Sequence, residues 1–190
     1  MTQASSAVGP DASAHPHETP ALLAGEGLPQ FEAITPDEVR QHIPGLLEEL
    51  NGRLAAIETD LEAALASGRT LSWEEVMDPL QQIGERLRWS WGVVSHLNGV
   101  CNSPELREAH ASQQAAVVAF GNRCGQSPVI DRVLRRLQQQ PGLDATQRRI
   151  LEAEIRDMAL RGVALPEAEQ QAFNAASQEL AELATRFGNQ

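Results

Sequence analysis

The hydrophobic residues of this chain recur with a helical period from residue 35 to the last residue. In residues 35–68, apolar side chains return every three or four positions over roughly eight turns, a spacing typical of a helix with one buried face. The same period recurs in five later segments: residues 72–101, 103–123, 127–140, 144–162 and 166–190. No segment alternates apolar and polar residues as a half-buried strand does. The pattern predicts an all-α protein of about six helices in an antiparallel array.

Capping residues mark the expected starts of these helices. Thr35 with Glu38, and Ser72 with Glu75, have the spacing of a capping box, in which the two residues satisfy each other's backbone N–H groups. Ser103 and Ser127 each precede a proline, and proline suits the first helical position because its missing N–H is not needed there. Asn102 competes with Ser103 for the cap, since Glu105 lies three positions after it and could complete a capping box. Gly68 is expected to end the first helix.

Prolines and tryptophans inside these segments predict irregularities. Pro44 should kink or restart the first helix, and Pro79 with Gly84 predicts a kink or irregular turn in the second. Trp89 and Trp91 are two residues apart on a helix and so point in different directions. One of them is therefore expected to meet another part of the protein, or solvent.

The first 34 residues lack this helical pattern. Residues 1–18 contain mostly Ala, Ser, Gly, Pro and His, and are expected to form a disordered tail. Residues 19–34 combine Gly and Pro with isolated apolar residues, which suits an extended segment laid over a helical body. Residues 35–190 form the helical region itself.

Charge and composition exclude several classes of function. The net charge is −11, and the 15 basic residues are all arginine and form no basic block, which argues against binding nucleic acid or an anionic membrane surface. No apolar run is long enough to span a bilayer, and no signal peptide is visible. Cys101 and Cys124 are expected to be free thiols. The expected compartment is the cytoplasm.

A polar strip ends the second helix. Ser95, Asn98 and Asn102 share one face at spacings of three and four, with His96 beside them and Ser103 capping the next helix. Two interpretations stay open. The strip is either a structural corner whose polar groups bond the adjacent backbone, or a surface that contacts a substrate in a channel.

The same residues carry a resemblance to a known family. The run from Ser95 to Ala109, Ser-His-Leu-Asn-x-Val-x-Asn-Ser-Pro-Glu-Leu-Arg-Glu-Ala, closely resembles the N-terminal region of oligopeptidase A and the wider thimet oligopeptidase family of zinc metallopeptidases. Shorter segments that are similar lie at Gly27–Val39, at Arg156–Asp157 and at Leu160-x-Gly-x-x-Leu-Pro166. The resemblance covers the chain from roughly Pro20 to its end. It implies a larger, mostly helical peptidase fold in which this region supplies one wall of a channel for short peptides.

The catalytic residues of that family are absent from these 190 residues. Zinc peptidases of this kind need His-Glu-x-x-His on a helix, which places two imidazoles on one face and a general base beside them. None of the five histidines has that spacing: His15, His17, His42, His96 and His110. We therefore expect no catalytic residue and no metal ligand here, and no activity from this chain alone. Zinc is implied only for the full-length protein.

Two functions are compatible with these observations. The first is the N-terminal helical region of a cytoplasmic zinc oligopeptidase, whose partners would be short peptides and the missing catalytic half of the same protein. The alternative is a standalone helical module that binds a peptide or a partner without chemistry. In the first case an apolar flank should be left uncovered, formed by Leu180, Leu183 and Phe187 with Trp89 or Trp91, and the chain should self-associate. The arginines of residues 132–136 are interpreted as a solvated face, or else as a site for an acidic partner.

Overall fold

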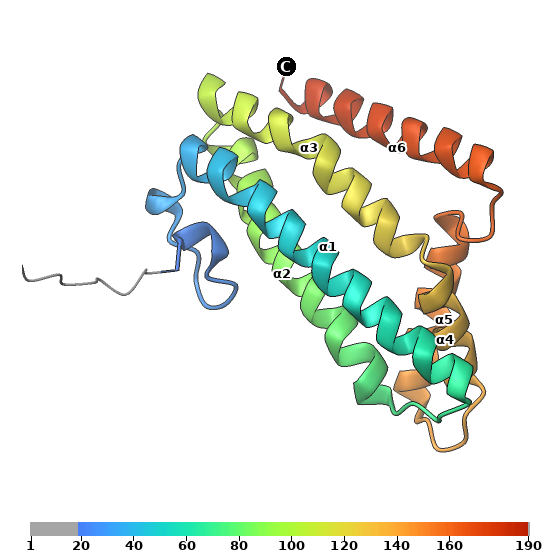
Figure 1. Cartoon of the computed structure of the whole chain (residues 1–190). Coiled ribbons are helices and arrows are strands. Elements are labelled where there is room, and N and C mark those ends of the chain that lie inside the picture. Colours follow the sequence, from blue (N-terminus) through green and yellow to red (C-terminus); the bar gives the residue numbers. More distant parts are fainter. Residues whose placement is uncertain (1–18, 190) are drawn as a thin grey trace, which may run out of the picture.

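The computed structural model describes residues 19–189, and these form six α-helices and no strand (Figure 1). Two short 3-10 turns, Ala21–Leu23 (η1) and Phe31–Ala33 (η2), come first. The helices are Pro36–Ser67 (α1), Trp73–Val100 (α2), Pro104–Gly125 (α3), Pro128–Gln138 (α4), Ala145–Leu160 (α5) and Glu167–Gly188 (α6). The all-α prediction is confirmed, and each helix lies within two residues of its expected start.

Side-chain caps explain why the helices begin where they do. The hydroxyl oxygen of Thr35 accepts a hydrogen bond from the Glu38 N–H at 3.2 Å. Ser72 and Glu75 form the reciprocal capping box that their spacing predicts. Further side-chain caps are made by Ser103, Ser127 and Asp144. Gly68 ends α1 with a φ of 71°, a left-handed conformation that glycine adopts without strain.

Helix α1 is the centre of the fold. It packs against α2, α3 and α4, so its buried residues lie on more than one side of the helix (Figure 1). Apolar side chains at most 6% exposed follow its length: Val39, Ile43, Leu46, Leu47, Leu50, Leu54, Leu61 and Ala64. Helix α5 packs on α4, at the end of the molecule where α1 finishes. The core is therefore built mainly from aliphatic side chains around one long helix.

The segment before α1 lies against the ends of α1 and α2. Leu22 of η1 is completely buried, and Ile34 is 6% exposed, so both contribute to the core. Contacts join η1 to α1 and to α2. Residues 1–18, expected to be a disordered tail, lie outside the described residues.

Neither a restart of α1 nor an irregular turn in α2 occurs among the described residues. Pro44 lies inside α1 and Pro79 inside α2, yet neither helix restarts, and α2 continues through Gly84 without an irregular turn. Each proline removes one hydrogen bond, which a long helix can lose when its apolar face is well packed. Pro44 is exposed, whereas the neighbouring Ile43 is fully buried and holds the helix in place. Tertiary packing therefore overrides the local signal.

One tryptophan of α2 meets another part of the protein, as expected: Trp91 stacks on His110 of α3. Trp89 and Trp91 are both half-buried, and both pack against the core from different sides of the helix. This is possible because α2 has neighbours on more than one side, namely α1, α3 and η1. Neither tryptophan joins Leu180, Leu183 and Phe187 as a fully exposed apolar side chain.

Helix α6 packs differently from the others. It lies along α3 at the edge of the molecule (Figure 1), and no side chain of α6 is fully buried. Its half-buried residues are small or polar apart from Phe173. Leu180, Leu183 and Phe187 are 68%, 48% and 81% exposed. The exposure expected for these three residues is confirmed, whereas self-association is a separate prediction that exposure alone does not test.

Gly84 offers a test of how α2 tolerates glycine. A Cβ atom added there would have no neighbouring group within 4 Å, so Gly84→Ala should stabilise the protein by about 0.5–1 kcal/mol by favouring the helical backbone. Gly68→Ala is the matched control, and should destabilise it because alanine disfavours a positive φ. Urea unfolding of both variants measures the two free energies. A destabilising Gly84→Ala would contradict the open space described here.

Candidate functional site

The corner between α2 and α3 holds the residues singled out by sequence. Ser103, not Asn102, is the N-cap of α3, and its hydroxyl oxygen accepts a hydrogen bond from the Leu106 N–H at 3.1 Å. Ser95 and His96 are exposed on the last turns of α2. The His96 ring lies 5.6 Å from the ring of Phe31, in a tilted arrangement. The imidazole of His96 is therefore exposed and is not part of the buried core.

The two asparagines of the strip lie in different surroundings. Asn102 accepts a hydrogen bond from Arg107 and donates one to Asn189 at 3.5 Å, so it joins the start of α3 to the end of α6. Asn98 is half-buried, and its side-chain oxygen has no hydrogen-bond partner among the described residues. Ser95, Asn98 and Asn102 therefore do not form one cluster, and Asn102 lies beyond the end of α2.

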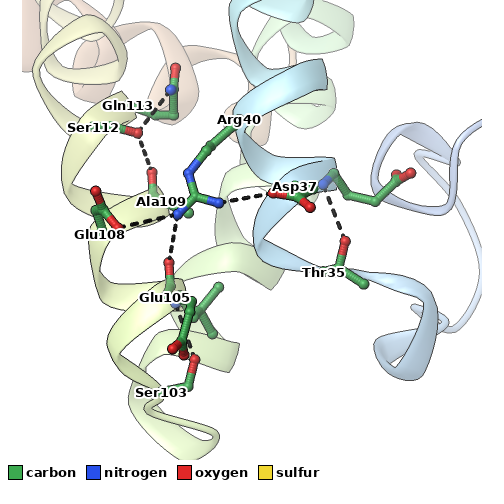
Figure 2. Close-up of polar contacts among 11 residues, drawn as sticks. Thr35, Asp37, Arg40, Ser103, Glu105, Glu108, Ala109, Ser112 and Gln113 are labelled. Carbon is green, nitrogen blue, oxygen red and sulfur yellow. Dashed lines mark hydrogen bonds and ion pairs between the residues drawn. The ribbon is translucent and has the colours of Figure 1, made fainter.

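Arg40 fixes this corner to α1. Its guanidinium donates to the backbone carbonyl of Glu105 at 3.3 Å, and also contacts the carboxylates of Glu108 and Asp37 (Figure 2). The capped starts of α1 and α3 are thus joined by one side chain. The arrangement holds the corner rigid and leaves Ser95 and His96 facing solvent.

A cleft of about 760 Å³ lies between α2, α3 and α5, within the size range of ligand-binding sites. Apolar side chains of these helices line it, among them Leu87, Trp91, Val117 and Met158, and Leu54 of α1 and Ile130 of α4 contribute as well. Charged residues of both signs also line it: Glu85, Arg88, Glu154, Asp157 and Arg161. Sequence reasoning did not identify this cleft. The available signals were the second tryptophan, Trp91, and Gly92 beside it.

A buried histidine supports the wall of this cleft. His110 of α3 stacks against Trp91 with ring centroids 4.6 Å apart and planes at 23°. Its side chain is only 6% exposed, and Nδ1 has no partner among the described residues. Burial lowers the pKa of His110 below its ordinary value of 6.5, because the charged form would lose its hydration. The stack keeps the Trp91 ring in one orientation.

A polar node joins three helices beyond the cleft. Glu58 of α1 accepts hydrogen bonds from Arg123 of α3 and from the hydroxyl of Ser127, the N-cap of α4. The hydrogen bond from Arg123 lowers the pKa of Glu58, and the hydroxyl of Ser127 acts in the same direction. This node sets the position of α4 against α1 and α3.

The arginines of α4 are occupied within the chain. Arg132 pairs with Glu62 of α1, Arg136 donates to the Gly68 carbonyl at 2.8 Å, and Arg135 pairs with Asp131 one turn earlier. Two of the three therefore hold α4 against the end of α1. Arg132 and Arg135 are both half exposed, so the expected solvated face is confirmed, although its charges are paired within the chain.

The side chains do not fit a zinc ion. Within residues 19–189, no group of three His, Cys, Asp or Glu residues is close enough to hold a metal. His42 lies beside Glu38, His96 beside Phe31 and His110 beneath Trp91, so these imidazoles do not converge. His15 and His17 lie outside the described residues. Burial raises the pKa of the Cys124 thiol to about 11, which keeps it protonated and a poor ligand.

Comparison with known protein families identifies this arrangement of helices. A family model described as the Neurolysin/Thimet oligopeptidase N-terminal domain matches residues 43–170. The chain belongs to this family. The match runs from α1 to the start of α6 and includes the whole α2–α3 corner and the cleft. Among the described residues, no helix is long and apolar enough to cross a membrane.

Three relatives show how the chain corresponds to longer members of the oligopeptidase family. It is 32% identical over 169 residues to the probable cytosolic oligopeptidase A of Arabidopsis thaliana, and equally similar to the organellar oligopeptidase A, chloroplastic/mitochondrial, of that plant. It is 30% identical over 174 residues to oligopeptidase A of Escherichia coli. These matches cover 87–90% of the chain. They cover only 20–25% of the relatives, so the chain spans a quarter or less of their length.

The corner gives one prediction about stability. Ser103→Ala should lower the free energy of unfolding by about 1 kcal/mol, because the Leu106 N–H loses its partner. His96→Ala should change it by less than about 0.5 kcal/mol, because the side chain is exposed. Urea unfolding of the two variants measures both values. A large loss in His96→Ala would show that its contact with Phe31 contributes more than its exposure suggests.

His110 gives a prediction about pH. Its pKa is lower in the folded protein than in the unfolded chain, so the unfolded chain binds more protons once the pH drops to about 6.5 and below. Stability should therefore be complete above this pH and decrease as the solution is acidified. His110→Phe keeps a ring against Trp91 but cannot titrate, and should lose less stability between about pH 7 and about pH 5. Thermal melts across this range test it, with the exposed His96→Phe as the control, which should behave like the unmodified chain.

Proposed function

We propose that this chain is the helical N-terminal region of a zinc-dependent oligopeptidase and forms one wall of the channel through which short peptides reach the catalytic centre. One observation carries the proposal: residues 43–170 match the N-terminal domain of the family, and the chain aligns over most of its length with proteins named oligopeptidase A. The proposed partners are short peptides and the remainder of the oligopeptidase. The proposed compartment is the cytoplasm, as in the relative named cytosolic.

The residue types present are the reason for assigning catalysis to the remainder of the protein. Peptide hydrolysis by a zinc enzyme needs a bound metal to polarise the carbonyl and a general base to activate water. The sequence has no His-Glu-x-x-His, and the histidines of the described residues point into separate environments. The chemistry is therefore assigned to the remainder of the longer protein, and this chain is proposed to be inactive alone.

The proposed role of this region is to select substrates by size. Long helices packed around α1 form a stiff wall, and a channel with stiff walls admits unfolded peptides and excludes folded domains. We assign the exposed strip with Ser95 and His96 to the channel side of this wall. Its hydroxyl, imidazole and amide groups offer hydrogen bonds to a peptide backbone without selecting one side chain. Arg40, which joins α1 to the start of α3, keeps this strip in a constant position.

The proposal predicts that the purified chain has no peptidase activity. Supplied with zinc and a short fluorogenic peptide, it should show no cleavage, and native mass spectrometry should show no stoichiometric zinc, because no ligand set converges in the described residues. Zinc-dependent cleavage that disappears in His96→Ala or His110→Ala would contradict it.

A chimera tests the positive half of the proposal. Residues 19–189 of this chain should replace the matched segment of Escherichia coli oligopeptidase A. The chimera should cleave short peptides in a zinc-dependent manner, since the helices of the two proteins are expected to pack alike. His96→Ala in the chimera should raise KM for peptides while leaving its melting temperature unchanged. A folded, zinc-loaded chimera without activity would contradict the proposed function.

A further inference from the structure

We infer that the cleft between α2, α3 and α5 is the docking groove for an amphipathic helix from the remainder of the oligopeptidase chain. The inference rests on the proposed function, because it takes the remainder of such a protein as the source of the helix. It goes further in assigning the contact to one surface and in giving the chemical character of the helix that binds there.

The lining of the cleft suits the apolar face of a helix. Its apolar side chains include Leu87 and Trp91 on α2, Val117 on α3 and Met158 on α5, with Leu54 of α1 and Ile130 and Leu134 of α4 also in the lining. A groove of this kind binds the apolar face of a helix through residues spaced three and four apart. Trp91 is held in place by its stack on His110, so this part of the wall is preorganised.

The backbone of α2 leaves room for close approach. Gly84 and Gly92 both line the cleft, and a Cβ atom added at either would have no neighbouring group within 4 Å. Gly121 on α3 lines the same cleft and is equally open. A second helix can therefore lie closer to α2 and α3 than it could over larger residues.

The charges of the cleft indicate the polar character of this helix. Glu85 and Arg88 on α2, and Glu154 on α5, form no ion pair with any residue in the part of the chain that the structure describes. Charges of both signs favour a helix that carries both signs beside its apolar face, since unlike pairs stabilise the complex and like pairs oppose it.

The remainder of the protein is a better occupant than a second copy of this chain. Each copy carries a net charge of −11, so two copies repel each other. The relatives are four to five times longer than their matched segments, which leaves three quarters or more of such a protein outside this structure. The exposed apolar face of α6 is a second surface left uncovered within residues 19–189. Both surfaces are accounted for if the longer chain folds over them.

Binding of helical peptides tests the inference. Fluorescent peptides of about 20 residues, long enough for a helix of some 30 Å, should tile the part of Escherichia coli oligopeptidase A outside the matched segment. Fluorescence anisotropy with the purified full chain measures binding. We expect at least one amphipathic peptide to bind, and the variant Gly84→Phe, which fills the cleft, to weaken its affinity at least about tenfold.

The controls separate the cleft from other surfaces. Gly52→Phe adds the same side chain at an exposed position of α1, outside the cleft, and should leave the affinity unchanged. Leu180→Arg on α6 should also leave it unchanged. Leu87→Arg is a second cleft variant and should weaken binding, with circular dichroism confirming that all variants are folded.

Three results would overturn the inference. These are binding by no peptide at about 100 µM chain, binding that Gly84→Phe and Leu87→Arg leave intact, and a dimer in sedimentation that Gly84→Phe dissociates, which would give the cleft to a second copy. Each is distinguishable from failure of the proposed function, because that is judged by zinc-dependent activity of the chimera. An active chimera combined with no peptide binding would leave the proposed function standing and remove only the docking groove.

Discussion

Burial of the apolar surface of α1 is the interaction on which the rest of the structure depends. Five of the largest completely buried side chains of the described residues belong to this helix: Val39, Ile43, Leu46, Leu50 and Leu54. Helices α2, α3 and α4 each cover part of it. Fully burying an aliphatic side chain contributes about 1.5–3 kcal/mol, so this set outweighs any single polar contact in the molecule. The polar contacts have another role. Glu58 with Arg123, Glu49 with Arg86, and Arg40 with Glu105 fix the direction in which each neighbouring helix crosses α1.

Local features of the fold could be predicted from sequence, whereas helix pairing could not. The caps at Ser72 and Ser103 depend on groups three residues apart, so their chemistry is visible in the sequence. Whether α1 continues through Pro44 depends on the packing of the buried Ile43 against distant residues, and the helix does not restart there. The exposed apolar face of α6 was expected, but not the partners of its other face, where Gln114 and Gln126 bond to Ala181, Thr185 and Asn174.

The candidate site shows the same division. The exposed polar strip at the end of α2 and its capped neighbour could be recognised from one run of sequence, because all of it is local. The cleft could not be recognised from sequence, since its walls combine residues from α2, α3 and α5 that are up to about 80 positions apart. His110 was equally hidden. His110 supports the cleft because it stacks on the ring of Trp91, and no regular spacing in the sequence links these two residues. Family membership, in contrast, follows from sequence alone, because matching residues do not require knowledge of which helices touch.

The amide-rich contact between α3 and α6 has a consequence for how the protein opens. Gln126 bonds to Asn174, and Gln114 to Thr185, across an interface in which no residue of α6 is fully buried. Separating α6 from α3 therefore exposes little new apolar surface, and water can replace the lost hydrogen bonds. The free energy of this local opening is much smaller than that of global unfolding. In native-state hydrogen exchange, the backbone amides of α6 would exchange as one early unit, while those of α1 would be protected until the whole domain unfolds.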